Sequence, residues 1–179
     1  MKTRRGTLAR RDFVVATVTA GTAFLSGCRL SRRSDWEFLS ERDARTLTAI
    51  CDQIVPADDF PSASQAGVVD FIDRQLVRHF RRYRSAYRDG LERAATISRK
   101  RYGGELAALT TAQQLEVVQA IEHEDRAFFE LLRNHTLDGY YGSPRHGGNR
   151  DAVSWRMVGL AEPPLLGRSP SQQKKGSTK

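Results

Sequence analysis

Apolar residues recur at spacings of three and four along most of this 179-residue chain, which is the periodicity of an amphipathic helix. Between residues 29 and 162, no stretch shows the sustained period-two alternation of a strand. The sequence therefore predicts an all-α fold, a compact bundle of about five helices over residues 40–162. A chain of this size can bury a single core, which removes roughly two thirds of the unfolded surface from water.

Capping residues and helix breakers set the expected helix ends. Ser40 can cap the first helix, which Pro56 stops, and Thr110 with Gln113 forms a capping box that opens the fourth. The other predicted ranges are 65–80, 83–102, a fifth helix that stops near Gly139 or Gly142, and a helical turn over 151–160. We expect the apolar stripes of these helices to face the core, and they consist of Ala44, Leu47, Ile50, Cys51, Ile54, Val68, Val69, Phe71, Ile72, Leu76, Phe80, Tyr87, Leu91, Ala94, Ala95, Ile97, Leu115, Val118, Ile121, Phe128, Leu131, Leu132 and His135.

The formal net charge of +8 is unevenly distributed along the chain. Residues 1–27 carry five basic groups and one acid, and residues 163–179 carry four basic groups and no acid. The charges of residues 28–162 therefore balance, and the ends account for the excess that would otherwise suggest a nucleic-acid partner. The Gly, Ser, Gln and Lys of residues 163–179 predict a disordered basic tail.

Residues 1–28 have the composition of an export signal. Basic residues precede a modestly apolar stretch at residues 14–25, which is shorter than the roughly 18 residues needed to cross a bilayer. Arg10, Arg11 and Phe13 resemble the twin-arginine (Tat) pattern, although the Ser or Thr that usually precedes the arginines is absent. The Tat route carries folded proteins, yet this chain shows no cofactor motif. The signal therefore suggests that a partner is the cargo that needs this route.

Leu25-Ser26-Gly27-Cys28 resembles a lipobox, in which the cysteine is acylated and becomes the new N-terminus. Acyl chains on Cys28 would hold the protein at a membrane without a spanning helix. The alternative is an ordinary cleaved signal, with Cys28 either free or paired with Cys51. Residues 29–39 are expected to form a tether that leads to the helical domain.

Motifs for catalysis and for metal or cofactor binding are missing from the chain. The four histidines lack convergent ligand spacing, and there is no P-loop, nucleophile elbow or dinucleotide fingerprint. Cys51 falls on an inward helical position, which is typical of an inert core thiol. We therefore expect no metal, no cofactor and no catalytic residue in this chain. An acid–base pair of His146 and Asp151 is the enzymatic alternative.

The densest basic stretch, residues 78–101, holds nine basic residues and has three interpretations. Nucleic-acid binding conflicts with export, so we expect no nucleic-acid partner. A solvated helix face would pair Arg88 with Glu92 and Asp89 with Arg93, each one turn apart. A docking surface for an acidic partner is the third interpretation.

Residues 137–160 form the most distinctive stretch. Its glycines permit left-handed backbone and close approach, and its aromatic and charged residues are of the types that anchor interfaces. A rigid loop that packs Trp155 back on the bundle is the alternative, and both interpretations can hold together. The candidate interface residues are Tyr140, Tyr141, Gly142, Pro144, Arg145, His146, Gly147, Gly148, Asn149, Arg150 and Trp155.

Most of the chain is similar to the gluconate 2-dehydrogenase subunit 3 family. The resemblance rests on the twin-arginine leader, on residues 47–56, 61–63 and 67–73, and above all on residues 139–155. In the last block the matching residues are Gly142, Pro144, Gly147, Gly148, Asn149 and Trp155. The family pattern usually has glycine at the positions that Ser62 and Ser154 occupy here.

The resemblance implies a small, non-catalytic subunit of a membrane-bound, FAD-dependent gluconate or sugar dehydrogenase. FAD would be held by a large flavoprotein partner of the glucose–methanol–choline type, often accompanied by a multihaem cytochrome c subunit. The flavoprotein typically lacks a signal and travels with the small subunit, which would engage the Tat translocon. The complex would lie on the periplasmic side of the envelope, anchored by lipid. A free-standing helical envelope lipoprotein that binds a small ligand is the alternative.

Overall fold

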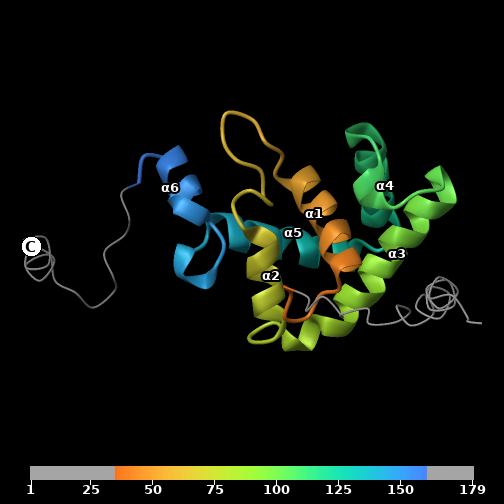
Figure 1. The fold of residues 1–179 in the computed structure, drawn as a ribbon, viewed down its shortest axis with the longest axis horizontal. Coiled ribbons are helices and arrows are strands. Elements are labelled where there is room, and N and C mark those ends of the chain that lie inside the picture. Colours follow the sequence, from red (N-terminus) through yellow and green to blue (C-terminus); the bar gives the residue numbers. More distant parts are fainter. Residues whose placement is uncertain (1–34, 161–179) are drawn as a thin grey trace, which may run out of the picture. The chain divides into compact units, whose positions relative to one another are not determined.

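The computed structural model describes residues 35–160, and every regular element in that range is helical. Its helices are α1 (Glu41–Ile54), α2 (Val68–Leu76), α3 (Arg84–Tyr102), α4 (Thr111–Glu124), α5 (Arg126–Tyr141) and the short α6 (Val153–Met157) (Figure 1). They are joined in part by 3₁₀ turns, which are η1 (Arg81–Tyr83), η2 (Leu106–Ala108), η3 (Pro144–His146) and η4 (Arg150–Ala152). The all-α prediction is confirmed. The predictions that lie outside the described residues concern Arg10, Arg11, Phe13, Cys28 and the tail at 163–179.

Local capping accounts for several helix ends. The Ser40 hydroxyl accepts a backbone N–H of the first turn of α1, and the capping box of Thr110 and Gln113 opens α4, as the sequence predicts. Gly103 ends α3 with a φ of 72°, in the left-handed region that glycine adopts at little cost. The fifth helix reaches Gly142, the later of its two expected ends.

The second helix is shorter than the predicted range of 65–80. It begins after Gly67, which has a φ of 80° and therefore cannot continue a helix. It ends at Leu76, after which the Phe80 N–H bonds back to the Gln75 carbonyl in a turn. Helical spacing of apolar residues continues through both turns, which is why the pattern overestimates the length of this helix.

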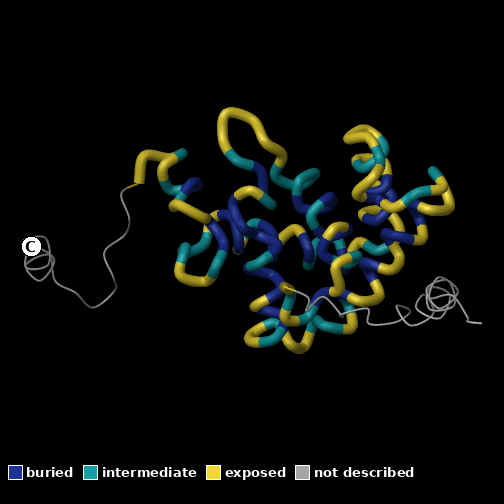
Figure 2. The backbone as a smooth tube through the Cα atoms, viewed as in Figure 1, coloured by how far each residue is buried: buried dark blue, intermediate teal, exposed yellow. Residues whose placement is uncertain are grey.

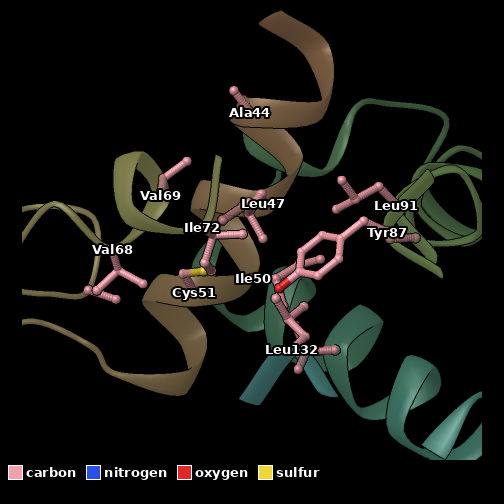
Figure 3. Packing of buried hydrophobic residues seen from close by; sticks show 14 of the residues in the cluster. Ala44, Leu47, Ile50, Cys51, Val68, Val69, Ile72, Tyr87, Leu91 and Leu132 are labelled. Atoms are coloured by element: carbon pink, nitrogen blue, oxygen red, sulfur yellow. The ribbon is translucent and has the colours of Figure 1, made fainter. Parts of the chain in front are cut away.

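The helix α1 lies at the centre of the bundle, where it packs against α2, α3, α4 and α5. Its fully buried Leu47 and Ile50 share one continuous core with Ile72 of α2, Tyr87 of α3 and Leu132 of α5 (Figure 3). Figure 2 shows this core as the buried inner faces of helices whose outer faces are exposed. The residues predicted to face inward on the first and third helices are therefore buried, with the exception of Ile54.

One predicted core residue, Leu115, lies at the surface with an exposed fraction of 44 %. The other two predicted residues of α4, Val118 and Ile121, are buried in the core, together with Val117 and Ala120, which were not predicted. Helical periodicity alone allows either stripe, and the packing of α4 against α1, α3 and α5 selects between them. Ile54, Phe80 and Leu131 are partly buried at the edge of the core.

Residues 37–39 are fixed to α2. The backbone N–H groups of Glu37, Phe38 and Leu39 donate to the carboxylate of Asp73 at 2.6, 2.9 and 2.9 Å. Asp73 is only 2 % exposed, and these three charge-assisted hydrogen bonds satisfy its buried carboxylate. The tether expected over residues 29–39 therefore ends before residue 37.

Candidate functional site

The distinctive stretch folds back onto α2 and α5 as a unit of residues 142–157, which contains η3, η4 and α6 (Figure 1). The Arg150 N–H donates to the Ala66 carbonyl at 2.9 Å, and the Arg150 guanidinium pairs with Asp70. The helical turn expected near the end of the domain is present here as η4 and α6. Contacts from the N-terminal end of α2 thus hold the middle of the 142–157 segment.

The buried side chain of Asn149 connects two parts of the segment through hydrogen bonds. Asn149 has no exposed surface, and its backbone lies in the left-handed region at φ 47°. Its Nδ2 donates to the Gly142 carbonyl at 2.8 Å, and its Oδ1 accepts the Ser154 N–H at 3.0 Å. Asparagine tolerates this backbone conformation better than most residues with a side chain. One buried side chain therefore ties the start of the segment to α6.

Two glycines allow the 142–157 segment, α5 and α2 to pack closely. A Cβ on Gly148 would overlap the Gly139 carbonyl oxygen, and a Cβ on Gly139 would lie 2.8 Å from a ring carbon of Phe71. Either side chain would force backbone or core atoms apart. These two positions of the distinctive stretch therefore serve packing within the chain.

Burial divides the candidate interface residues. Tyr140, Gly148 and Asn149 are buried within the chain, so they shape the segment from within. The Tyr140 hydroxyl donates to the Pro61 carbonyl at 2.8 Å. The half-buried candidates are Gly142, Pro144, Gly147 and Trp155. The candidates whose side chains are exposed are Tyr141, Arg145, His146 and Arg150.

Trp155 joins an exposed apolar surface at the end of α5 and α6, which we call the apolar end and which consists of Tyr141, Trp155, Val158 and Leu160. The indole N–H of Trp155 donates to the Tyr141 carbonyl at 3.1 Å, and the Trp155 carbonyl accepts the Leu160 N–H at 2.8 Å. Tyr141 is 48 % exposed, and Val158 and Leu160 are each 60 % exposed. Val158 and Leu160 are not among the interface residues predicted from the sequence, although their apolar character beside the distinctive aromatic residues was a usable signal.

Glu92 on α3 pairs with Arg42 of α1 at 3.2 Å and with Arg99, two turns along α3, at 2.8 Å. The hydrogen bond from Arg99 is the largest of the effects that lower the pKa of the Glu92 carboxyl. The expected pair of Glu92 with Arg88 is therefore wrong. The packing of α1 against α3 brings a cation to this carboxylate that helical spacing does not anticipate.

Arg93 pairs with Asp125, which caps α5, and the expected pair of Arg93 with Asp89 is also wrong. In the later half of the basic stretch, Arg93 and Arg99 thus have carboxylate partners, whereas Lys100 and Arg101 have none among residues 35–160. By contrast, no carboxylate of residues 35–160 forms an ion pair with an arginine of residues 78–88. The tertiary structure therefore gives carboxylate partners to Arg93 and Arg99 and gives none, within residues 35–160, to the arginines of residues 78–88.

Buried polar groups pair with one another inside the core. His135 Nδ1 bonds to the Tyr87 hydroxyl at 3.0 Å, and its ring stacks on Phe80 with centroids 3.8 Å apart. Burial is the main cause that lowers the pKa of His135 to about 4. Cys51 is a free thiol with no exposed surface, it contacts Thr136 Oγ1 at 3.4 Å, and burial raises its pKa to about 12. The prediction that Cys51 is a core thiol is confirmed.

Within residues 35–160, no group of three or more His, Cys, Asp or Glu side chains is arranged to hold a metal ion. No helix of that range combines the length and the hydropathy of a membrane-spanning segment. His146 and Asp151, the enzymatic alternative, are both exposed. An open groove of about 520 Å³ lies along α3 and the start of α5, lined by Tyr83, Ala86, Asp89, Arg93, Asp125, Ala127, Phe128 and Leu131.

A family comparison places this geometry in context. The profile of the family described as gluconate 2-dehydrogenase subunit 3 matches residues 41–162, which is more than half of the chain. The chain belongs to the gluconate 2-dehydrogenase subunit 3 family. The subunit 3 match runs from the start of α1 to beyond α6 and includes the whole 142–157 segment. No curated protein and no solved structure matches the chain.

Proposed function

We propose that this chain is the non-catalytic accessory and export-escort subunit of a membrane-bound, FAD-dependent gluconate or sugar dehydrogenase. The family match over residues 41–162 carries this proposal. The twin-arginine pattern at Arg10, Arg11 and Phe13 supports the export role. A chain without a cofactor motif gains little from a route for folded proteins unless a folded partner travels with it.

The proposed partner is a large flavoprotein of the glucose–methanol–choline type, which would hold the FAD, and a multihaem cytochrome c subunit would complete the complex. The proposed docking surface combines the apolar end with neighbouring exposed groups and consists of Tyr141, Arg145, His146, Trp155, Val158 and Leu160. Aromatic and arginine side chains dominate the energetics of protein interfaces. The 142–157 segment is held by internal hydrogen bonds. Binding a partner would therefore immobilise few additional groups and would lose little conformational entropy.

Acylated Cys28 is the proposed anchor of the complex on the periplasmic side of the envelope. The lipobox-like residues 25–28 support this assignment. Each buried CH₂ of an acyl chain contributes roughly 0.8 kcal/mol to membrane binding, so several chains hold a protein of this size without a spanning helix.

The export role is tested by replacing Arg10 and Arg11 with lysine in a cell that also makes the flavoprotein. The expected result is that dehydrogenase activity stays in the cytoplasm. Arg4 and Arg5 provide a matched control, because no phenylalanine stands two residues beyond that pair. Lysine at both of these positions should leave export unchanged. Normal export of the activity in the Arg10→Lys, Arg11→Lys variant would contradict the escort role.

The docking surface is tested by co-purification of the flavoprotein, followed by its flavin absorbance. The variant Tyr141→Ala with Leu160→Ser removes two exposed apolar side chains, and we expect a loss of affinity of about tenfold or more. Leu115→Ser is the matched control, because Leu115 is 44 % exposed on α4 and Tyr141 is 48 % exposed. Equal recovery of the flavoprotein with both variants would show that the apolar end is not part of the interface.

The groove along α3 and α5 favours a second candidate, a free-standing lipoprotein that binds a small ligand. Phe128 and Leu131 supply an apolar wall, and Arg93 and Asp125 supply polar groups. Purification of the exported chain from its native envelope as a monomer with no flavoprotein would support this candidate. Recovery of an FAD-containing partner would count against it.

A further inference from the structure

Six arginines and no carboxylate lie between residues 74 and 88. Five of these arginines surround the turn between α2 and α3, and we call them the arginine corner, which consists of Arg78, Arg81, Arg82, Arg84 and Arg88. All are exposed except Arg84, which is half-buried. Among the described residues, none of the five has an ion-pair partner. The corner therefore carries a concentrated positive charge that the fold itself leaves unneutralised.

The fold holds three of these side chains in place. Arg81 Nε donates to the Val77 carbonyl at 2.6 Å, and Arg84 Nε donates to the Leu76 carbonyl at 2.7 Å. The guanidinium of Arg84 lies 5.3 Å from the ring centroid of Phe38, and that of Arg88 lies 5.1 Å from it. These contacts use carbonyls and a ring, so they position the guanidinium groups and leave their charge available to an outside anion.

The described chain begins at this corner. Phe38 lies against Arg84 and Arg88, and residues 37–39 are bonded to Asp73 of α2. In Figure 1, the chain enters α1 from the lower edge, beside the turn that joins α2 and α3. Asp35 and Glu37 are exposed carboxylates at this point, and the three arginines of residues 29–34 outnumber them.

The short chain between Cys28 and Asp35 limits how far the arginine corner can lie from the proposed lipid anchor. Seven peptide units separate Cys28 from Asp35, and a fully extended chain of that length spans at most about 25 Å. An acylated Cys28 would therefore keep Asp35, three residues before the Phe38 that contacts the corner, within about 25 Å of the bilayer.

We propose that the arginine corner is the face of the protein that binds an anionic phospholipid bilayer. This inference rests on the lipid anchor in the proposed function and adds an orientation to it. Arginine binds phosphate groups through paired N–H donors, and each basic residue near an anionic surface strengthens binding about fivefold. With the corner on the membrane, the apolar end, which belongs to α5 and α6, stays available to the flavoprotein.

The test measures which face of the exported, full-length mature protein lies near lipid. A fluorescent label is attached at Ser85→Cys, an exposed position in the corner, or at Gln119→Cys, an exposed position on α4. Cys51 has no exposed surface and stays unlabelled. Energy transfer to dye-labelled lipid is compared in vesicles of one part phosphatidylglycerol to two parts phosphatidylcholine and in vesicles of phosphatidylcholine alone. We expect stronger transfer from position 85, only in the anionic vesicles, and loss of the difference in high salt.

Charge variants test whether membrane binding depends on the arginine corner or on the overall positive charge of the protein. Arg78→Gln, Arg82→Gln and Arg88→Gln together should lower the equilibrium constant for binding of the corner to anionic vesicles about 100-fold. Lys100→Gln, Arg101→Gln and Arg133→Gln remove the same charge from exposed positions elsewhere and should leave transfer unchanged. Equal transfer from positions 85 and 119, or equal effects of the two triple variants, overturns the proposal.

Two further readouts keep this proposal distinct from the proposed function. If the corner variant loses the flavoprotein in co-purification, the corner binds that protein and the membrane assignment is overturned; we expect the flavoprotein to be retained. Mass spectrometry of the same preparation reports whether Cys28 is acylated. An unmodified Cys28 contradicts the anchor. The labelled variants then also carry Cys28→Ser, so that energy transfer from position 85 with vesicles in excess still decides whether the corner binds anionic lipid.

Discussion

Gly148 and Gly139 approach each other so closely that a Cβ on Gly148 would overlap the Gly139 carbonyl oxygen. This contact joins the 142–157 segment to α5, at the centre of the stretch that most resembles the family. The residues of that stretch that look most distinctive in the sequence thus include ones that face inward. Their role is to set the position of the exposed residues beside them.

Replacing Gly148 with alanine should destabilise the protein by about 3 kcal/mol, because the added methyl group meets backbone rather than a movable side chain. Chemical denaturation of the exported protein measures this change. Gly104→Ala is the control, because a Cβ there would find Leu109 at an ordinary 3.7 Å, and its effect should stay within about 0.5 kcal/mol. Equal effects of the two substitutions would show that the close approach is unimportant.

Asn149→Ala should cost about 3 kcal/mol and loosen the 142–157 segment. The substitution leaves the Gly142 carbonyl and the Ser154 N–H without their partner, and it places alanine in a left-handed conformation. Hydrogen exchange of the Ser154 amide should accelerate in step. Asn134→Ala, at an exposed position on α5, should leave both measurements near those of the unmodified protein. Unchanged protection of Ser154 in the Asn149 variant would contradict the assigned bond.

Asp73→Ala should release residues 37–39 from α2 and cost about 3 kcal/mol, since three backbone donors lose a charged acceptor. Limited proteolysis before α1 should become faster. Asp70→Ala provides the comparison, because Asp70 pairs with Arg150 and should affect the 142–157 segment instead. Cleavage before α1 at the same rate in both variants would argue against this division of roles.

Stability should fall as the pH drops from 6.5 toward 4 because of His135. Its pKa is about 4 in the folded protein against an ordinary 6.5, so the unfolded chain takes up the proton first. The loss approaches about 1.4 kcal/mol per pH unit within this window and is absent above it. The Asp138 carboxylate opposes the shift and Arg82 reinforces it.

The pH dependence is measured by urea unfolding at a series of pH values, with His135→Gln as the comparison. Glutamine does not titrate, so the slope between pH 6.5 and 4 should flatten in that variant. The exposed His79, His123 and His146 are common to both proteins and cancel in the comparison. An identical slope in the two proteins would assign the effect to other groups.

Ser154→Ala should raise stability by about 1 kcal/mol. The Ser154 hydroxyl is buried and has no hydrogen-bond partner within residues 35–160, so removing it relieves an uncompensated desolvation. Ser85→Ala, at an exposed position, should change stability by less than about 0.5 kcal/mol. A loss of stability in the Ser154 variant would mean that its hydroxyl has a partner after all.

Features that depend on a few neighbouring residues were predictable. The caps at Ser40 and Thr110 were found because a cap joins residues three apart in the sequence. The second helix was predicted too long, since apolar spacing persists through the turns on either side of it. The choice between Leu115 and Val117 as the inward residue of α4 depended on neighbouring helices, which a periodic pattern does not contain.

The sequence by itself determined the all-helical class, most helix ends and the family, because these follow from local spacing and from a contiguous motif. Only the tertiary structure decided which motif residues face inward, as Asn149 does, and which charges find partners, as Glu92 does with Arg42. Fifty residues separate that ion pair in the chain. Packing between helices brings such groups together. The local conformational preferences of the sequence do not show which groups will meet in this way.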